Sequence, residues 1–271
     1  MPRLTLFRLP NKLRRQVRRS RMATLTLLAL LLAVAVLFPL YSVYCVYKPP
    51  RALIGYLRQK YPDVLFEVSS SLLPPAAAPK IVALSLDDAP SSHTADILDV
   101  LREHDARATF FVIGSQADTT ARAALLRRIV RDGHELANHG MRDEPRDLLV
   151  EAYRAEEQGG AAGAGVLPNN YYRPGSGFFN RAMRQRLGNA GYRITLGSVY
   201  PHDAQIANPT RNAAHILSMV HPGAIIICHD RRQWTAPMLR LVLPALRDQG
   251  YQVVTITDLV KTAEPLGGGR S

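Results

Sequence analysis

Residues 80–90 have the sequence KIVALSLDDAP, a short apolar run followed at once by two carboxylates. An apolar run of this length, bounded by a turn signal, predicts a buried strand over Lys80–Leu86. Similar runs recur along the rest of the chain. They predict further strands at Arg107–Ile113, Glu135–His139, Tyr171–Arg173, Arg193–Leu196, Ala224–Cys228 and Gln252–Ile256.

Amphipathic segments lie between these predicted strands. Apolar residues recur at i, i+3 and i+4 around residues 97–101, 125–130 and 239–246, which indicates helices. Gly133, Gly191 and Gly250 each follow a helical stretch and precede a predicted strand, as glycines at helix C-termini do. Strand–helix alternation over about seven units predicts an α/β fold with a parallel sheet, either open or closed into a barrel.

The charge of the chain is unevenly distributed. The 271 residues carry a net charge of +12. Residues 1–22 hold eight Arg or Lys and no acid, whereas the chain from Lys80 onward has 22 basic and 20 acidic residues. The basic character therefore belongs to the N-terminus. We expect no nucleic-acid partner for the main domain.

The segment after this basic tail is long and apolar. Residues 23–47 contain no charge and are sufficient to cross a hydrocarbon core of roughly 30 Å as a helix. Tyr41, Tyr44 and Tyr47 lie at its far end, where amphipathic rings favour the membrane interface. A cleaved signal peptide is the alternative, but the run is longer than usual and no A-x-A-like site follows it. The positive-inside rule then predicts a single-pass type II membrane protein, with the remainder in the secretory lumen, at the cell surface or in the periplasm.

Composition also predicts the domain boundaries. Residues 48–79 form a juxtamembrane segment and linker, in which 48–68 contain a short helix and an extended piece and 69–79 (SSSLLPPAAAP) bury little. The catalytic domain is predicted over 80–262. The Gly-rich residues 263–271 are predicted to be a disordered tail.

Two pairs of polar residues follow predicted strands. Asp87 and Asp88 repel each other unless a cation holds one of them, so that one carboxylate could bind a metal and the other act as a base. The alternative is a turn that caps the next helix. His139 and Asp143 are four residues apart, the spacing at which two side chains on a helical turn reach one ion, although a surface hydrogen bond has the same spacing.

Two further strands end in a single polar group. Arg173 could hold a carboxylate in its charged form, and His229 could donate a proton to a leaving group. Taken alone, a strand-ending Arg and a strand-ending His are ordinary features of α/β proteins.

In this order, the clusters resemble the polysaccharide deacetylases, the chitin-deacetylase-like carbohydrate esterases. Residues 85–90 are similar to the family's first motif, Thr-Phe-Asp-Asp-Gly-Pro. Four other stretches match the family's second strand, metal motif, Arg-Pro motif and final strand with its histidine: residues 108–114, 134–143, 172–177 and 225–229. The resemblance spans about Pro49–Val260, which is most of the chain outside the apolar segment.

The resemblance implies a distorted (β/α) barrel of about seven parallel strands and hydrolysis of an N-acetyl group from an amino sugar. It also assigns a role to each of seven residues: Asp87 as the base, Asp88, His139 and Asp143 as metal ligands, Arg173 as the group that orients Asp87, His229 as the general acid and Asp203 as the group that holds the His229 tautomer.

The expected cofactor is a divalent metal, zinc before cobalt or manganese. The family usually has a second His where this chain has Asp143, and aspartate oxygen is an accepted zinc ligand. Two acidic ligands should weaken the pull of the ion on its water, which predicts tolerance of harder metals or a higher pH optimum. Ala89 replaces the family's Gly, so the turn after Asp88 must avoid positive φ at that residue.

Two residues are candidates for substrate binding. A backbone N–H near Ser176 could stabilise the oxyanion. Trp234 could stack on a sugar ring, although core packing explains a tryptophan equally well. The expected partners are an N-acetylated glycan and the membrane. Two alternatives remain: a catalytically silent glycan-binding protein of the same fold, and a deacetylase of a lipid-linked amino sugar.

Overall fold

The computed structural model of the chain describes residues 11–73, 80–117, 119–141 and 170–263. The chain divides into two compact units, Met1–Pro50 and Arg51–Ser271. The described part of the first unit, residues 11–50, contains one helix, α1 (Asn11–Tyr47). Its Arg18–Tyr47 part is long and apolar enough to cross a membrane, and none of it is buried. The predicted N-terminal apolar helix is therefore present.

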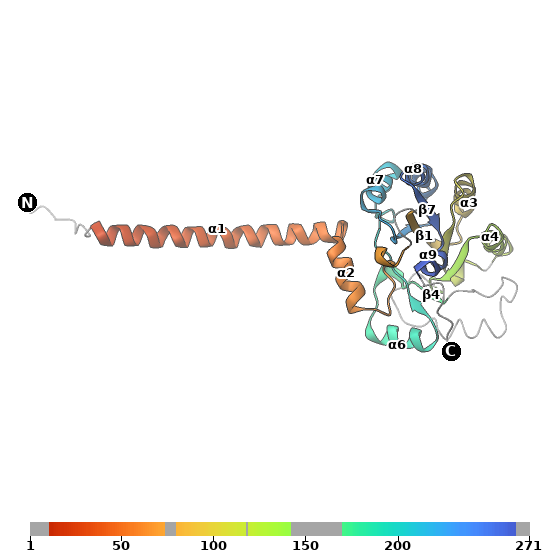
Figure 1. The fold of residues 1–271 in the computed structure, drawn as a ribbon, viewed down its shortest axis with the longest axis horizontal. Coiled ribbons are helices and arrows are strands. Elements are labelled where there is room, and N and C mark those ends of the chain that lie inside the picture. The colour runs from red at the N-terminus through yellow and green to blue at the C-terminus, as the bar shows by residue number, and fades with distance from the viewer. Residues whose placement is uncertain (1–10, 74–79, 118, 142–169, 264–271) are drawn as a thin grey trace, which may run out of the picture. The chain divides into compact units, whose positions relative to one another are not determined.

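The second unit is built on a seven-stranded parallel sheet (Figure 1), as predicted. The strand order is β5-β4-β3-β2-β1-β6, and β7 also pairs with β1. β1 is thus central, because it pairs with β2, β6 and β7. The strands are β1 (Lys80–Ala89), β2 (Ala108–Val112), β3 (Glu135–Asn138), β4 (Tyr171–Tyr172), β5 (Arg193–Ile194), β6 (Ile225–His229) and β7 (Tyr251–Val254).

Helices surround this sheet, and α9 lies inside their ring (Figure 1). α3, α4 and α8 coincide with the three predicted amphipathic patterns, and α6 is the helical stretch predicted to end before Gly191. Helix α7 was not predicted. The three glycines predicted to end helices do so, with φ between 79° and 82°. The helices are α2 (Arg51–Lys60), α3 (Thr94–Glu103), α4 (Thr120–Arg131), α6 (Arg181–Asn189), α7 (Pro209–Met219), α8 (Thr235–Asp248) and α9 (Ile256–Ala263).

The alternation of side chains along β1 separates the two core layers of the barrel. Leu84 and Leu86 point outward into the layer that packs against helices such as α3 and α8. Ala83 points inward, into the layer that contains residues of α9. Successive side chains of a strand face opposite sides. Ser85 and Asp87 therefore share the inner face with Ala83, and the strand aims Asp87 into the barrel.

An extended segment upstream of β1 closes the barrel between β5 and β6. Leu65 forms an isolated bridge with Thr195, and Glu67 forms another with Ala224. The backbone N–H of Leu65 donates to the carbonyl of Ile194 at 2.8 Å. Residues 51–68 form a short helix and an extended piece, and the compact unit that contains the sheet begins at Arg51.

Gly223 allows this segment to approach the sheet closely. Its φ is +86°, and a Cβ at this position would lie 2.1 Å from the carbonyl oxygen of Val68. The N–H of Val68 donates to the carbonyl of Gly223 at 2.9 Å. Glu67 adds an ion pair to Arg58 at 3.1 Å and a contact with Nε2 of His221 at 3.2 Å. Only glycine fits the backbone approach, so the closing segment depends on it.

Candidate active site

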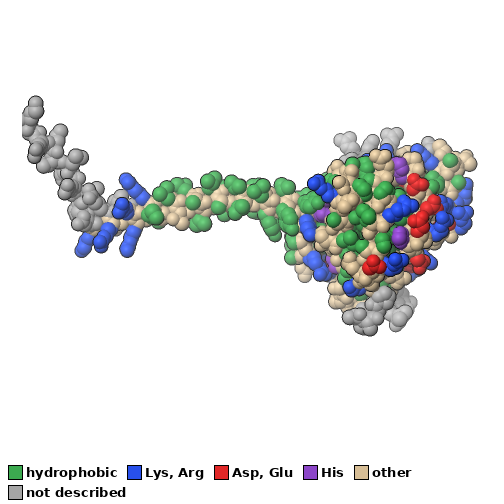
Figure 2. Space-filling model, turned by 90° about the horizontal axis from the view of Figure 1, so that it is seen from above, with side chains coloured by type: hydrophobic (Ala, Val, Ile, Leu, Met, Phe, Trp, Pro, Cys, Tyr) green, Lys and Arg blue, Asp and Glu red, His purple; other side chains and the backbone are tan. Residues whose placement is uncertain are grey.

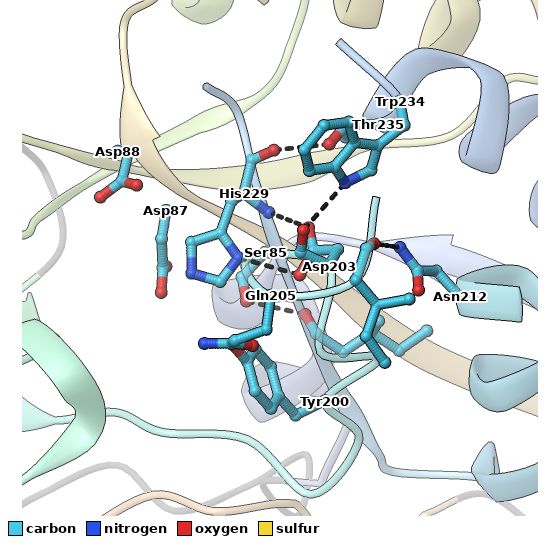
Figure 3. Close-up of polar contacts among 12 residues, drawn as sticks. Ser85, Asp87, Asp88, Tyr200, Asp203, Gln205, Asn212, His229, Trp234 and Thr235 are labelled. Atoms are coloured by element: carbon cyan, nitrogen blue, oxygen red, sulfur yellow. Dashed lines mark hydrogen bonds and ion pairs between the residues drawn. The ribbon is translucent and has the colours of Figure 1, made fainter. Parts of the chain in front are cut away.

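The carboxyl ends of several strands meet in one mouth of the barrel. Asp87 lies opposite His229 in the pairing of β1 with β6. His139 follows β3 directly, and Arg173 follows β4. Asp203 comes from the loop after β5 and contacts His229 (Figure 3). Five polar residues that are far apart in sequence are therefore brought together, all of them at least half-buried.

A break in β1 places both of its adjacent carboxylates in this mouth. In a regular strand Asp87 and Asp88 would face opposite sides. Asp88 instead has φ of 65°, and the register with β2 shifts between Leu86 and Ala89. Such bulges re-aim side chains, and aspartate tolerates the left-handed region better than most residues. Ala89 stays within the strand, so the positive φ falls one residue before the position where the family has Gly.

Arg173 is a buried cation that donates four hydrogen bonds. Only 2% of the residue is exposed. Its guanidinium also stacks 3.9 Å from the centre of the Phe111 ring. A charge this deeply buried must be paired and hydrogen-bonded. The guanidinium of Arg173 donates to Asp87 Oδ1 at 2.5 Å, to Ser85 Oγ at 2.9 Å, to the carbonyl of Thr195 at 3.0 Å and to the carbonyl of Leu196 at 3.1 Å. These contacts fix one orientation of Asp87.

His139 and Asp88 form a pair of donors suited to a metal. His139 Nδ1 donates to the carbonyl of Arg173 at 2.8 Å, which leaves Nε2 facing Asp88. His139 Nε2 and Asp88 Oδ1 are 3.5 Å apart. Two atoms that bind one zinc ion at 2.0–2.1 Å with tetrahedral geometry lie about 3.4 Å apart. The two side chains therefore fit a shared metal ion.

The electrostatics of this pair also favour a cation. Burial by itself lowers the pKa of His139, but the nearby charges of Asp87 and Asp88 outweigh it and raise the pKa above its usual value. Burial likewise raises the pKa of Asp88, yet contact with His139 and the charge of His229 lower it overall. Both pKa shifts have the same cause: a positive charge is stabilised beside the carboxylates of Asp87 and Asp88.

The third predicted metal ligand, Asp143, lies outside the described residues. Within the residues that the structure describes, no group of three His, Cys, Asp or Glu could hold a metal ion. A complete three-residue ligand set thus stays a prediction.

His229 and Asp203 form a second, separate pair. His229 Nδ1 lies 2.9 Å from Asp203 Oδ1, and Asp203 Oδ2 accepts the backbone N–H of His229 at 2.8 Å. Burial lowers the pKa of His229, but the hydrogen bond and charge of Asp203, with Asp87 and Asp88, outweigh it and raise the pKa to about 9. The imidazole is therefore charged at neutral pH. Figure 3 shows it between Asp203 and Asp87.

The two predicted substrate-binding residues, Trp234 and Ser176, differ in burial. The indole N–H of the half-buried Trp234 donates to the carbonyl of Asp203 at 2.8 Å, beside the His229 pair (Figure 3). Ser176 is exposed and has φ of 59° in the short 3-10 turn Gly175–Gly177, three residues after Arg173. Contact of either residue with a substrate stays a prediction.

Two residues of the mouth were not among the predicted site residues. Ser85 accepts a hydrogen bond from Arg173 and donates one to the carbonyl of Ile226 at 2.8 Å. The ring of Tyr200 packs edge-on against the imidazole of His229, with centroids 5.9 Å apart. Strand alternation could have identified Ser85, because it lies two residues before Asp87. The sequence carries no comparable signal for Tyr200.

Comparison with known proteins agrees with this geometry. Residues 75–195 match the polysaccharide deacetylase family. A chitooligosaccharide deacetylase of a Bradyrhizobium species is 31% identical over 199 aligned residues, and the match covers 66% of this chain and 90% of the relative. The chain belongs to the polysaccharide deacetylase family. The resemblance inferred from the motifs is therefore confirmed, and the activity class is hydrolytic deacetylation.

Two other matches show how this polysaccharide deacetylase relates to characterised members. A peptidoglycan-N-acetylglucosamine deacetylase of Bacillus cereus is 29% identical, over 67% of this chain and 89% of the relative. Among solved structures, a family 4 acetyl xylan esterase from Clostridium thermocellum, in complex with a cobalt ion, has a TM-score of 0.60 and 29% identity. That match covers 67% of this chain and 91% of the esterase.

Proposed function

We propose that the protein is a metal-dependent hydrolase that removes N-acetyl groups from N-acetylglucosamine-containing, chitin-like polysaccharide or oligosaccharide. One observation carries the proposal: a carboxylate and a charged imidazole face the same mouth, each held by its own buried partner. Asp87 is held by Arg173, and His229 is held by Asp203. The names of two relatives, a peptidoglycan-N-acetylglucosamine deacetylase and a chitooligosaccharide deacetylase, support this substrate class.

The two pairs fit the proton transfers of amide hydrolysis. The reaction needs a base for the attacking water and an acid for the departing nitrogen. Asp87 accepts the proton of the water, because Arg173 holds its carboxylate in one orientation. His229 carries a proton at neutral pH and donates it to the amine, while Asp203 fixes the tautomer through Nδ1. Their separate partners keep the two roles distinct.

Asp88 and His139 would hold the metal, together with Asp143. Their nitrogen and oxygen donors suit zinc, and cobalt or manganese are the alternatives. The cobalt ion in the acetyl xylan esterase structure supports a divalent ion in this fold. When bound, such an ion lowers the pKa of a water and polarises the acetyl carbonyl.

The membrane topology is also part of the proposal. Helix α1 would anchor the protein as a single-pass type II membrane protein, since eight basic residues precede its apolar part. The catalytic unit would then lie on the non-cytoplasmic side. The apolar helix favours one second candidate, deacetylation of a lipid-linked amino sugar, which the membrane would bring to the same surface.

Acetate release by the full chain in detergent tests the reaction. We expect release from chito-oligosaccharides that a chelator abolishes and added zinc restores. Asp87→Asn should remove it, whereas Asp63→Asn should not, because Asp63 is an exposed partner of Arg184. Activity that survives Asp87→Asn would contradict the assigned base. Release only from N-acetylglucosaminyl lipids would favour the second candidate. Substrate binding without any release would favour the silent binding protein.

A further inference from the structure

Helix α2 belongs to the ring of helices that covers the sheet. Ile54 is 7% exposed and packs in one apolar cluster with Tyr172 of β4 and Ile194 of β5. Leu187 of α6 joins the same cluster. α2 and α6 together therefore cover the outer side of β4 and β5, and α2 belongs to the same compact unit as the barrel.

The outward face of α2 combines apolar and basic groups. Leu53 is 38% exposed and Tyr56 is 53% exposed. The ammonium of Lys60 lies 5.5 Å from the ring centre of Tyr56. The helix sequence RALIGYLRQK contains three basic residues and no acid. Exposed aliphatic and tyrosine side chains beside basic groups are typical of helices that lie in the interface of a membrane.

The chain connection restricts where this face can be. α1 ends at Tyr47 and α2 begins at Arg51, so only residues 48–50 separate the two helices. A fully extended chain advances at most about 3.6 Å per residue, so Arg51 lies within about 14 Å of Tyr47. Tyr44 and Tyr47 are expected at the membrane interface. With the proposed anchor in place, the first turn of α2 therefore lies within about 14 Å of the membrane interface.

We propose that the outward face of α2, formed by Leu53, Tyr56 and Lys60, lies on the bilayer that holds α1 and contacts anionic phospholipid headgroups. The inference rests on the proposed anchor and is independent of the proposed substrate. Leu53 and Tyr56 insert at the acyl boundary, and Lys60 pairs with phosphate. Because the inner face of α2 packs on Tyr172, directly before Arg173, the contact sets the orientation of the catalytic mouth relative to the membrane.

Fluorescence quenching in vesicles tests this contact on the full chain. The protein has two cysteines, and Cys228 is fully buried, so a thiol-reactive fluorophore labels Cys45 of α1 in the unmodified chain. In a Cys45→Ala background, Tyr56→Cys places the label on α2. Leu241→Cys is the matched control, since Leu241 is 46% exposed on α8, which packs against α7 and α3. The vesicles contain phosphatidylcholine and phosphatidylglycerol with a spin-labelled phospholipid as quencher.

We expect the labels at positions 45 and 56 to lose most of their fluorescence and the label at 241 to keep it. Loss at position 56 should be smaller in vesicles of phosphatidylcholine alone, because the anionic partner is missing. Quenching at 45 with none at 56 would overturn the α2 contact and leave the anchor intact. No quenching at 45 would overturn both. If the label at position 56 keeps its fluorescence at high protein concentration whatever the amount of quencher, a second copy of the chain covers this face. That result would also refute the proposal.

Discussion

Replacing Asp203 with asparagine should lower the pKa of His229 and thereby shift the pH range in which the enzyme is active. The Asp203 carboxylate is fully buried and makes the 2.9 Å contact with His229 Nδ1. It is the strongest influence that raises the pKa of His229 to about 9, against the effect of burial. Asparagine is nearly isosteric and removes this charge, so that burial then acts with less opposition.

The size of the effect follows from the two pKa values. At pH 8 a His229 with a pKa of 9 is about 90% protonated, whereas one with the ordinary pKa of 6.5 is about 3% protonated. The supply of general acid falls about 30-fold at this pH, but by less than about 1.5-fold at pH 6. A bound cation would lower both pKa values together, so the prediction concerns the difference between the two proteins.

The assay is kcat/KM for acetate release from pH 5 to pH 10, with Asp63→Asn as the matched control. We expect the basic limb of the Asp203→Asn profile to move down by about 2.5 pH units, while Asp63→Asn leaves it in place. A loss of equal size at pH 6 and pH 8 would refute the reasoning. In that case Asp203 would act on the tautomer or on folding, and not on the pKa of the acid.

Three further predictions concern stability. Arg173→Lys cannot supply the planar set of donors and should lower the free energy of unfolding by about 3–5 kcal/mol in urea titrations, whereas Arg184→Lys should cost less than about 1 kcal/mol. Burial lowers the pKa of His134 to about 4, so between pH 6.5 and pH 4 the unfolded chain binds a proton that the folded chain does not. Stability should therefore fall by about 2 kcal/mol from pH 7 to pH 5 in the parent protein but not in His134→Gln; parallel curves would contradict this. Finally, a chain that begins at Lys80 loses five buried apolar residues, Ile54, Val64, Leu65, Phe66 and Val68. Each contributes about 1.5–3 kcal/mol, so their loss should abolish the cooperative thermal transition that we expect of a chain beginning at Arg51. Equal thermal transitions in the two chains would refute the conclusion that this segment closes the barrel.

The strands were predictable because each is a compact apolar run. Helix α6 was predicted only through the glycine that follows it, Gly191, since its nine residues include only two large apolar side chains, Met183 and Leu187. Helix α7 carried usable local signals, because Asn208 caps it and Pro209 occupies its first turn. Capping residues at the ends of a helix can therefore predict it where its apolar periodicity is weak.

The site was predictable in composition but not in geometry. The order of the motifs identified Asp87, His139, Arg173 and His229, and parallel topology explains why they meet. The positive φ of Asp88 was not predicted, because it depends on the register between β1 and β2. Pairings between distant residues leave no local pattern in the sequence.

The segment that closes the barrel has a consequence for biosynthesis. Leu65 leaves the ribosome long before its partner Thr195, which lies 130 residues further along the chain, and Glu67 precedes Ala224 by a greater interval. At about 5–20 residues per second, translation keeps this apolar segment without its partner for roughly 6–26 s. Long-range pairings of this kind form slowly and leave apolar surface exposed to aggregation in the meantime. The order of synthesis thus makes an early segment of the catalytic unit one of the last to find its place, and the open barrel is the species that cellular chaperones would need to protect.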